Sequence, residues 1–207
     1  MELSRSRLSD RPVTRSGRLL VGLVLFGLAL ALLVRARLGL DPWTVFSSGL
    51  STRVHLTLGE VTVLSSLVVL LLWIPLRQRP GLGTVANALV VGPVLDLGVA
   101  VLPAPQPLAL RVLFLVLAVV LVAAGTGLYV GAGWGPGPRD GLMTGLVRLG
   151  VPLYLARTLI EGTVLVVGWV LGGTVGVATV VYALAVGPLV ARALPRMTLP
   201  PTPGRDG

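Results

Sequence analysis

Residues 81–96 read Gly-Leu-Gly-Thr-Val-Ala-Asn-Ala-Leu-Val-Val-Gly-Pro-Val-Leu-Asp, and residues 176–191 read Gly-Val-Ala-Thr-Val-Val-Tyr-Ala-Leu-Ala-Val-Gly-Pro-Leu-Val-Ala. The two stretches align without a gap, and eight of their sixteen positions are identical. A chain this rich in Leu, Val, Gly and Ala would give about two identities by chance. The match therefore indicates an internal repeat, with convergence of two glycine-rich helices as the alternative.

A second pair of blocks repeats at nearly the same distance along the chain. Residues 39–50 match residues 135–146 at four positions, where Gly39, Pro42, Gly49 and Leu50 recur as Gly135, Pro138, Gly145 and Leu146. Two blocks that match in the same order disfavour convergence. The sequence thus predicts two related units, residues 18–102 and 108–194.

The composition places most of the chain in a lipid bilayer. Hydrophobic residues make up 54% of the 207 positions and charged residues 12%, about half the charged share of a soluble domain. All 17 basic residues are arginine, which excludes a P-loop lysine or a Schiff-base lysine, and there is no cysteine for a thiol nucleophile or a disulfide. The net charge of +9 is spread over the ends of apolar stretches, which argues against nucleic-acid binding.

Six apolar stretches have the length of a transmembrane helix, about 20 residues. They cover residues 18–36, 57–76, 81–102, 108–131, 151–172 and 175–194. Each unit thus crosses the membrane three times, and an odd number of crossings inverts the second unit relative to the first. The predicted fold is an all-α membrane protein with six transmembrane helices in two inverted three-helix repeats. Residues 1–17 are expected to be a basic cytoplasmic segment and residues 195–207 a disordered cytoplasmic tail.

The distribution of arginine predicts the orientation of the bundle. With the N-terminus in the cytoplasm, twelve arginines fall inside and four outside. The inside set is Arg5, Arg7, Arg11, Arg15, Arg18, Arg77, Arg79, Arg139, Arg148, Arg192, Arg196 and Arg205, and the outside set is Arg35, Arg37, Arg53 and Arg111. Because arginine favours cytoplasmic loops, we expect a multi-pass protein of the bacterial plasma membrane with both termini in the cytoplasm.

Each unit also contains a short segment that starts with proline. Asp41 and Pro42 have the pattern of an N-cap followed by proline at the first helical position, and Gly137 and Pro138 offer the same start. About ten residues follow in each case, which predicts a half-helix too short to cross a bilayer. Such half-helices either enter the membrane and present their N-termini to an anionic group, or lie at the interface without a ligand.

Polar residues at membrane depth are costly, which makes each of them a candidate for function. The candidate substrate-binding residues are Asp41, Trp43, Glu60, Asn87, Asp96, Arg139, Asp140, Arg157 and Glu161. Arg157 and Glu161 are one helical turn apart and can pair, and the repeat alignment sets Glu60 opposite Arg157. A structural ion-pair network that locks the two halves together is the alternative. The other tryptophans, Trp73, Trp134 and Trp169, are expected at the membrane interfaces.

Enzymatic chemistry finds little support in the sequence. The one histidine, His55, has no partner motif, and Phe46-Ser47-Ser48-Gly49 has no histidine on another helix to activate a serine. A single histidine without cysteine makes a transition-metal site improbable. We expect no enzyme activity, no cofactor and no metal.

Several motifs resemble those of the bacterial YczE/YyaS/YitT-type integral membrane proteins. These are Gly39-Leu-Asp-Pro-Trp43, Gly83-Thr84 with Asn87, Gly92 and Asp96, Gly137-Pro-Arg-Asp-Gly-Leu-Met143, Arg157-Thr-Leu-Ile-Glu161 and Leu171-Gly-Gly-Thr-Val-Gly176. The likeness covers roughly residues 18–192 and implies a six-span protein of the bacterial plasma membrane. Relatives often carry an acidic residue where this chain has Thr44, so a carboxylate role at that position does not carry over.

Inverted repeats, paired half-helices and buried charges together favour a small secondary transporter or exporter. Its expected partners are the lipid bilayer and an unidentified small molecule, for which an anionic group is one option, and the sequence is compatible with a homo-oligomer. A membrane scaffold or accessory protein without transport activity is the alternative.

Overall fold

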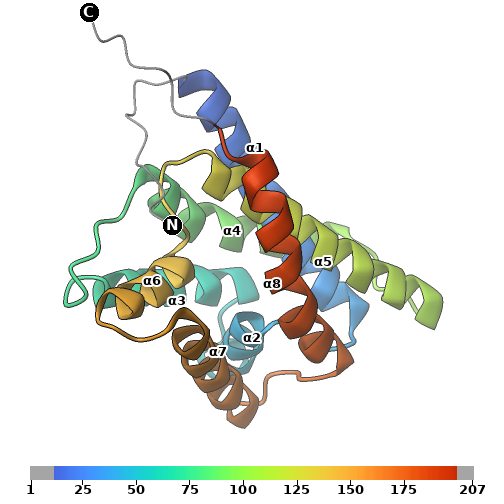
Figure 1. Ribbon diagram of the computed structural model, residues 1–207. Coiled ribbons are helices and arrows are strands. Elements are labelled where there is room, and N and C mark those ends of the chain that lie inside the picture. The colour runs from blue at the N-terminus through green and yellow to red at the C-terminus, as the bar shows by residue number, and fades with distance from the viewer. Residues whose placement is uncertain (1–11, 200–207) are drawn as a thin grey trace, which may run out of the picture.

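The computed structural model describes residues 12–199, and within this range the chain forms eight α-helices and no β-strand. The helices are α1 (Pro12–Ala36), α2 (Pro42–Val54), α3 (Leu58–Leu72), α4 (Leu82–Val101), α5 (Leu108–Gly131), α6 (Pro138–Arg148), α7 (Leu153–Val170) and α8 (Val177–Met197). The predicted all-α class is therefore confirmed (Figure 1). The parts of the two predicted terminal segments at residues 1–11 and 200–207 lie outside the described residues.

Five of these helices are long and apolar enough to cross a membrane, namely α1, α4, α5, α7 and α8. Helix α3 has 15 residues, fewer than the roughly 20 that span a bilayer core. Helices α2 and α3 form a sixth candidate only if they count as one span, and they are bent by 111° relative to each other. The predicted second span at 57–76 is thus shorter than expected.

The two Pro-initiated half-helices form where the sequence predicts them. Helix α2 has 13 residues and starts at Pro42, and the Asp41 carboxylate accepts a hydrogen bond from the Thr44 N–H at 3.3 Å. Helix α6 has 11 residues and starts at Pro138 after Gly137, which has no side chain to cap it. Proline fits both starts because the first helical N–H has no partner within the helix.

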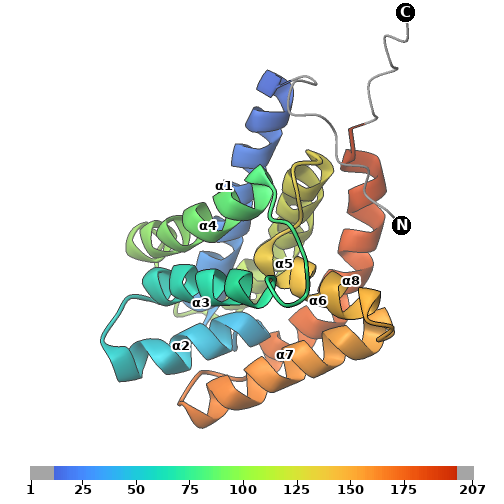
Figure 2. The same cartoon turned by 90° about the vertical axis from the view of Figure 1, so that its left-hand side faces the viewer.

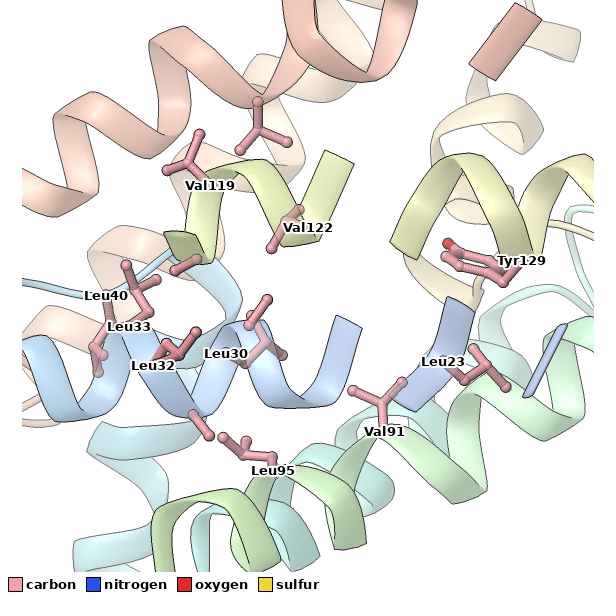
Figure 3. Packing of buried hydrophobic residues seen from close by; sticks show 14 of the residues in the cluster. Leu23, Leu30, Leu32, Leu33, Leu40, Val91, Leu95, Val119, Val122 and Tyr129 are labelled. Atoms are coloured by element: carbon pink, nitrogen blue, oxygen red, sulfur yellow. The ribbon is translucent and has the colours of Figure 1, made fainter. Parts of the chain in front are cut away.

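The hydrophobic core is built around α1, which lies between α4 and α5. Leu30 and Leu33 of α1 are fully buried, with Val122 of α5 on one side and Leu95 of α4 on the other (Figure 3). The α1–α5 contact is close because Gly22 leaves room for the backbone of α5, where a Cβ would come within 2.6 Å of the Tyr129 nitrogen.

Two arginines join the ends of α1 and α5 reciprocally. The Arg15 guanidinium donates to the Ala132 carbonyl at 2.6 Å, and Arg111 Nε donates to the Ala36 carbonyl at 2.8 Å. In each bond the start of one helix reaches the end of the other, so α1 and α5 are antiparallel. The donors and the acceptors are both 96 residues apart, the same spacing as Gly39 and Gly135.

The starts of α4 and α8 are held by a second reciprocal pair of hydrogen bonds. The Gly83 N–H donates to the Trp134 carbonyl, before α6, and the Ala178 N–H donates to the Leu38 carbonyl, before α2, both at 2.8 Å. The loops that accept these bonds also share a backbone conformation. Gly39 has a φ of 114° and Gly135 a φ of 116°, values that side-chain-bearing residues rarely adopt.

The remaining helices gather beside this core. Figures 1 and 2 show α2, α3, α6 and α7 together in the lower part of the molecule, where α2 packs along α7 and α3 contacts both α4 and α6. Helix α1 pairs with α4 as α5 pairs with α8. The half-helices therefore pack mainly against α3 and α7, beside the α1–α5 core.

The expected interfacial position of two tryptophans needs correction. Trp73 and Trp134 are not interfacial side chains, because both are buried in protein and only Trp169 is well exposed, at 65%. Trp73 donates through Nε1 to the Pro138 carbonyl at 3.0 Å and thereby holds the start of α6. Helix α1 begins at Pro12 and α8 continues to Met197.

Candidate functional site

A polar cavity of about 270 Å³ lies where the half-helices meet the long helices. Its wall includes side chains from α1, α3, α4, α5, α7 and α8 as well as from α2 and α6. The polar side chains of the lining are Asp41, Trp43, Thr62, Ser66, Asn87, Thr126, Tyr129, Arg139, Asp140, Arg157, Glu161 and Tyr182.

The N-termini of the two half-helices face each other across this cavity. An ion pair joins Arg139 Nη1, in the first turn of α6, to Asp41 Oδ2, the N-cap of α2, at 3.7 Å. The Arg139 guanidinium also lies 4.8 Å from the centre of the Trp43 ring, a cation–π distance. Trp43 and Arg139 are 96 residues apart, so they occupy corresponding positions in the two sequence repeats.

Helix α5 contacts Asp140, the next residue of α6. The Tyr129 hydroxyl donates to Asp140 Oδ2 at 2.9 Å. The Tyr129 ring is fixed in turn by an edge-to-face contact with Phe26 of α1, with the ring centres 6.1 Å apart. This contact ties the position of the Asp140 carboxylate to the α1–α5 core.

Helix α7 supplies a second ion pair to the wall. Arg157 Nε donates to Glu161 Oε1 at 3.0 Å, and the spacing of four residues places both side chains on one face of the helix. Arg157 is 39% exposed and Glu161 23%, whereas Asp41 is 2% exposed. The charged wall is therefore most accessible on the α7 side.

The charges and dipoles around the cavity suit a ligand that carries both signs. Three carboxylates and two guanidinium groups line the wall, and each half-helix N-terminus adds about half a positive charge. Within residues 12–199, Asp41 Oδ1 and Trp43 Nε1 are buried without a hydrogen-bond partner. Buried polar atoms usually have partners, so these two are available to a bound molecule. No group of three metal-ligating side chains occurs in the described part of the chain.

Seven of the nine predicted site residues line this one cavity. They are Asp41, Trp43, Asn87, Arg139, Asp140, Arg157 and Glu161. They come from α4, α6, α7 and the start of α2, so only the tertiary structure brings them together.

The other two predicted residues, Glu60 and Asp96, lie elsewhere and hold the start of α3. Asp96 Oδ2 accepts from the Thr57 hydroxyl at 2.5 Å, and Asp96 Oδ1 accepts from the Gly59 N–H at 2.7 Å. Glu60 accepts from the Thr57 N–H at 2.8 Å in a capping box. The expected juxtaposition of Glu60 with Arg157 is not present, because the Glu60 carboxylate is used for capping at the surface.

Sequence reasoning missed two tyrosines in the wall, Tyr129 and Tyr182. The repeat alignment sets Tyr182 opposite Asn87, which could have identified it as a second polar residue at the same place. Tyr129 gave no such signal, since an aromatic residue near the end of an apolar helix is ordinary there.

Comparison with known proteins identifies relatives along almost the whole chain. A family of unknown function, DUF6198, matches residues 13–194. An uncharacterized protein of Haemophilus influenzae is 37% identical over 173 residues, which cover 83% of this chain and 79% of that protein. The uncharacterized membrane protein YczE of Bacillus subtilis is 30% identical over 178 residues, covering 84% and 83% respectively.

No solved structure matches the chain. The similarity to YczE confirms the resemblance carried by the sequence motifs. Together with several helices of membrane-spanning length, it makes the protein a multi-pass membrane protein. The chain belongs to the DUF6198 family.

Proposed function

We propose that the protein is a small secondary transporter whose substrate binds in the central polar cavity. One observation carries the proposal: charged residues from both sequence repeats, Asp41 and Arg139 above all, meet at facing half-helix N-termini. Secondary transporters commonly bind substrate at such a junction, where unpaired N–H groups and buried charges replace its hydration shell.

The two units are proposed to be inverted copies. Antiparallel packing of α1 and α5 supports this orientation, as does the reciprocity of the Arg15–Ala132 and Arg111–Ala36 hydrogen bonds. A two-fold axis that exchanges antiparallel membrane spans runs parallel to the membrane plane.

Transport would then proceed by rocking of one unit against the other around the cavity. Helices α3 and α4 pack closely, whereas the corresponding helices α7 and α8 hardly touch. In an inverted-repeat transporter, exchange of these two arrangements moves the opening from one side of the membrane to the other. The opposite state would bring α7 and α8 together and separate α3 from α4.

The proposed substrate is a small molecule with an anionic group and a cationic group. Arg139, Arg157 and the half-helix N-termini suit the anionic group, and the carboxylates Asp41, Asp140 and Glu161 suit the cationic group. A purely anionic substrate is less well matched, because carboxylates outnumber guanidinium groups in the lining.

We further propose the bacterial plasma membrane as the location, with both termini in the cytoplasm. The excess of arginine in the predicted inside segments supports this orientation, and it holds without Arg139, which lies in the cavity. The lipid bilayer is the proposed partner, with no nucleic acid, and a homo-oligomer is compatible with the exposed faces of α7 and α8. The proposal assigns the chain no enzymatic step, metal or cofactor.

The test uses purified protein in liposomes that contain a trapped pH-sensitive dye. Anionic, cationic and zwitterionic metabolite mixtures are added under an imposed pH gradient, and the same mixtures are tested for thermal stabilisation of the protein. We expect a response to a zwitterionic mixture that the variant Arg139→Gln lacks although it folds. The matched control is Arg148→Gln, at the end of α6 outside the cavity. A response to none of the mixtures by either measurement would contradict the proposal.

A scaffold without transport activity is the second candidate, and the ion pairs favour it. Arg139 pairs with Asp41 and Arg157 with Glu161, so the charges could serve only to hold the helices together. Exchanging the residues, as Arg157→Glu with Glu161→Arg, distinguishes the candidates. A scaffold keeps its expression and cellular phenotype after the exchange, whereas a transporter folds but loses activity because the positive charge has moved.

A further inference from the structure

An apolar groove of about 530 Å³ runs along the surface between α2, α3 and α7. Its walls include Phe46 and Leu50 of α2, Val61 and Val68 of α3 and Ile160 of α7, and its only hydroxyl groups are those of Ser65 and Thr163. The volume lies within the range of about 300–1,000 Å³ that is usual for ligand sites.

The groove opens at the surface of the molecule, along exposed apolar side chains. Leu64, Val68 and Leu72 on one wall and Leu159 on the other are each about half exposed. In a membrane protein, exposed apolar side chains at membrane depth contact acyl chains, and such a position is the one we expect for α3 and α7. A molecule can therefore reach the groove from the bilayer without passing through water.

Within residues 12–199, Trp43 is the one residue that lines both this groove and the polar cavity. On the cavity side, the Arg139 guanidinium lies 4.8 Å from the centre of the Trp43 ring. The Trp43 Nε1 is buried without a hydrogen-bond partner among the described residues. A polar space lined by charges of both signs and an apolar groove at the surface therefore meet at Trp43.

We infer that the substrate is an amphiphile with a compact zwitterionic head that binds in the cavity and an aliphatic tail that lies in the groove. This rests on the proposed function and specifies its substrate class. Arg139 and Arg157 would bind the anionic part of the head and Asp41 the cationic part, and Trp43 would pack against the junction of head and tail. A fully water-soluble solute would leave the adjoining apolar groove without a role.

The probe for the experiment is a lysophosphatidylethanolamine that carries a photoreactive diazirine near the end of its tail. The intact protein is placed in phosphatidylcholine nanodiscs with a small fraction of the probe, and labelled residues are mapped by mass spectrometry after illumination. We expect residues of the groove to be labelled about ten times more than residues on the exposed face of α5 around Val120.

A filled groove should lose this labelling. Val68→Trp places a large ring in the groove and should reduce the groove labels several-fold, and Leu159→Trp on the opposite wall serves if the first variant does not fold. Val120→Trp, on the exposed face of α5, is the matched control and should leave the labels unchanged. Size-exclusion profiles and thermal unfolding verify the fold of each variant.

Competition separates recognition of the head from occupation by any lipid tail. Unlabelled lysophosphatidylethanolamine should displace the probe at about tenfold lower concentration than a monoacylglycerol of the same tail length, and Arg139→Gln should abolish that preference. Glycerophosphoethanolamine, which has the head without a tail, should displace it poorly.

Two results would overturn the inference. Equal labelling of the groove and of α5 would mean ordinary annular lipid only, and equal displacement by monoacylglycerol would mean a tail site without recognition of the head. In either case an Arg139-dependent response of the liposomes to a water-soluble zwitterion would leave the proposed transport function intact. Absence of that response together with specific groove labelling would instead refute transport and leave an amphiphile-binding protein.

Discussion

Helices α3 and α4 and helices α7 and α8 are corresponding pairs in the two sequence repeats, yet they are packed differently. At the α3–α4 contact, a Cβ on Gly59 would overlap the Gly92 carbonyl and a Cβ on Gly92 would overlap the Gly59 carbonyl, so the backbones touch. Gly187, which aligns with Gly92, instead faces the Arg157 guanidinium, 3.3 Å from where its own Cβ would lie. The Arg157 side chain thus lies between α7 and α8 at the position where α3 and α4 are in backbone contact.

A single aligned position accounts for part of this difference. Asp96 of α4 binds the start of α3 through Thr57 and Gly59, whereas Ala191, its counterpart in α8, has no such side chain and lines the cavity. The α3–α4 pair is therefore held together by a carboxylate, whereas the α7–α8 pair has no such bond at the aligned position. The repeated helical pattern thus sets the architecture, and a few polar positions decide which helix pair packs closely.

The largest expected effect concerns two tryptophans that are 96 residues apart. Trp73 is 2% exposed and binds the Pro138 carbonyl, while Trp169 on α7 is 65% exposed. We expect Trp73→Ala to lower the free energy of unfolding by about 3–5 kcal/mol, the usual range for loss of a buried tryptophan. Trp169→Ala should change it by about 0.5 kcal/mol or less. Thermal or denaturant unfolding in detergent measures both, and similar losses would show that the two helices are equally packed.

The glycines of the two contacts should differ next. Gly92→Leu forces the α3 and α4 backbones apart and should cost up to about 3 kcal/mol or prevent folding. A Cβ at Gly187 would have only the flexible Arg157 side chain within 4 Å, so we expect Gly187→Leu to keep the fold. It should nevertheless abolish transport, because α7 and α8 could no longer close. A Gly187→Leu protein that folds and remains fully active in the liposome assay would contradict the proposed rocking motion.

Removal of the carboxylate that locks α3 tests the asymmetry directly. Asp96→Ala should cost about 1–3 kcal/mol, because the Thr57 hydroxyl and the Gly59 N–H lose a charged acceptor. Glu60→Gln is the control, since its amide oxygen can still accept the exposed capping bond, and should cost about 0.5 kcal/mol or less. Equal unfolding curves for Asp96→Ala and the unmodified protein would mean that glycine packing alone closes this pair.

The smallest perturbation probes orientation without changing stability. Activity of a reporter fused after residue 79, in the α3–α4 linker, should be cytoplasmic, and a reporter near residue 173, in the α7–α8 linker, should lie outside. A reporter fused after residue 148 should also be cytoplasmic, and one near residue 104 should also lie outside. The same side for residues 79 and 173 would end the inverted-repeat interpretation, and with it the proposed exchange of the two helix pairs.

Local sequence signals predicted the half-helices well. Pro42 and Pro138 begin α2 and α6 because proline lacks the N–H that a first helical residue cannot use, and this property does not depend on distant contacts. The candidate site could be predicted residue by residue, since charge at membrane depth is costly wherever it occurs. Glu60 and Asp96 fitted that criterion equally well, although their oxygens cap a helix, because the sequence does not show which donors lie nearby.

The helical class, the sequence repeat, the half-helix starts and most of the charged residues that line the cavity could be predicted from the amino-acid sequence. These features follow from composition, spacing and backbone chemistry, which act over a few residues. Only the tertiary structure decided that Trp43 lies beside Arg139, that Tyr129 binds Asp140 and that α3–α4 is closed while α7–α8 is open. Those contacts depend on the distances between helices. The distances are set by the packing of many side chains at once, so they cannot be predicted from any one segment.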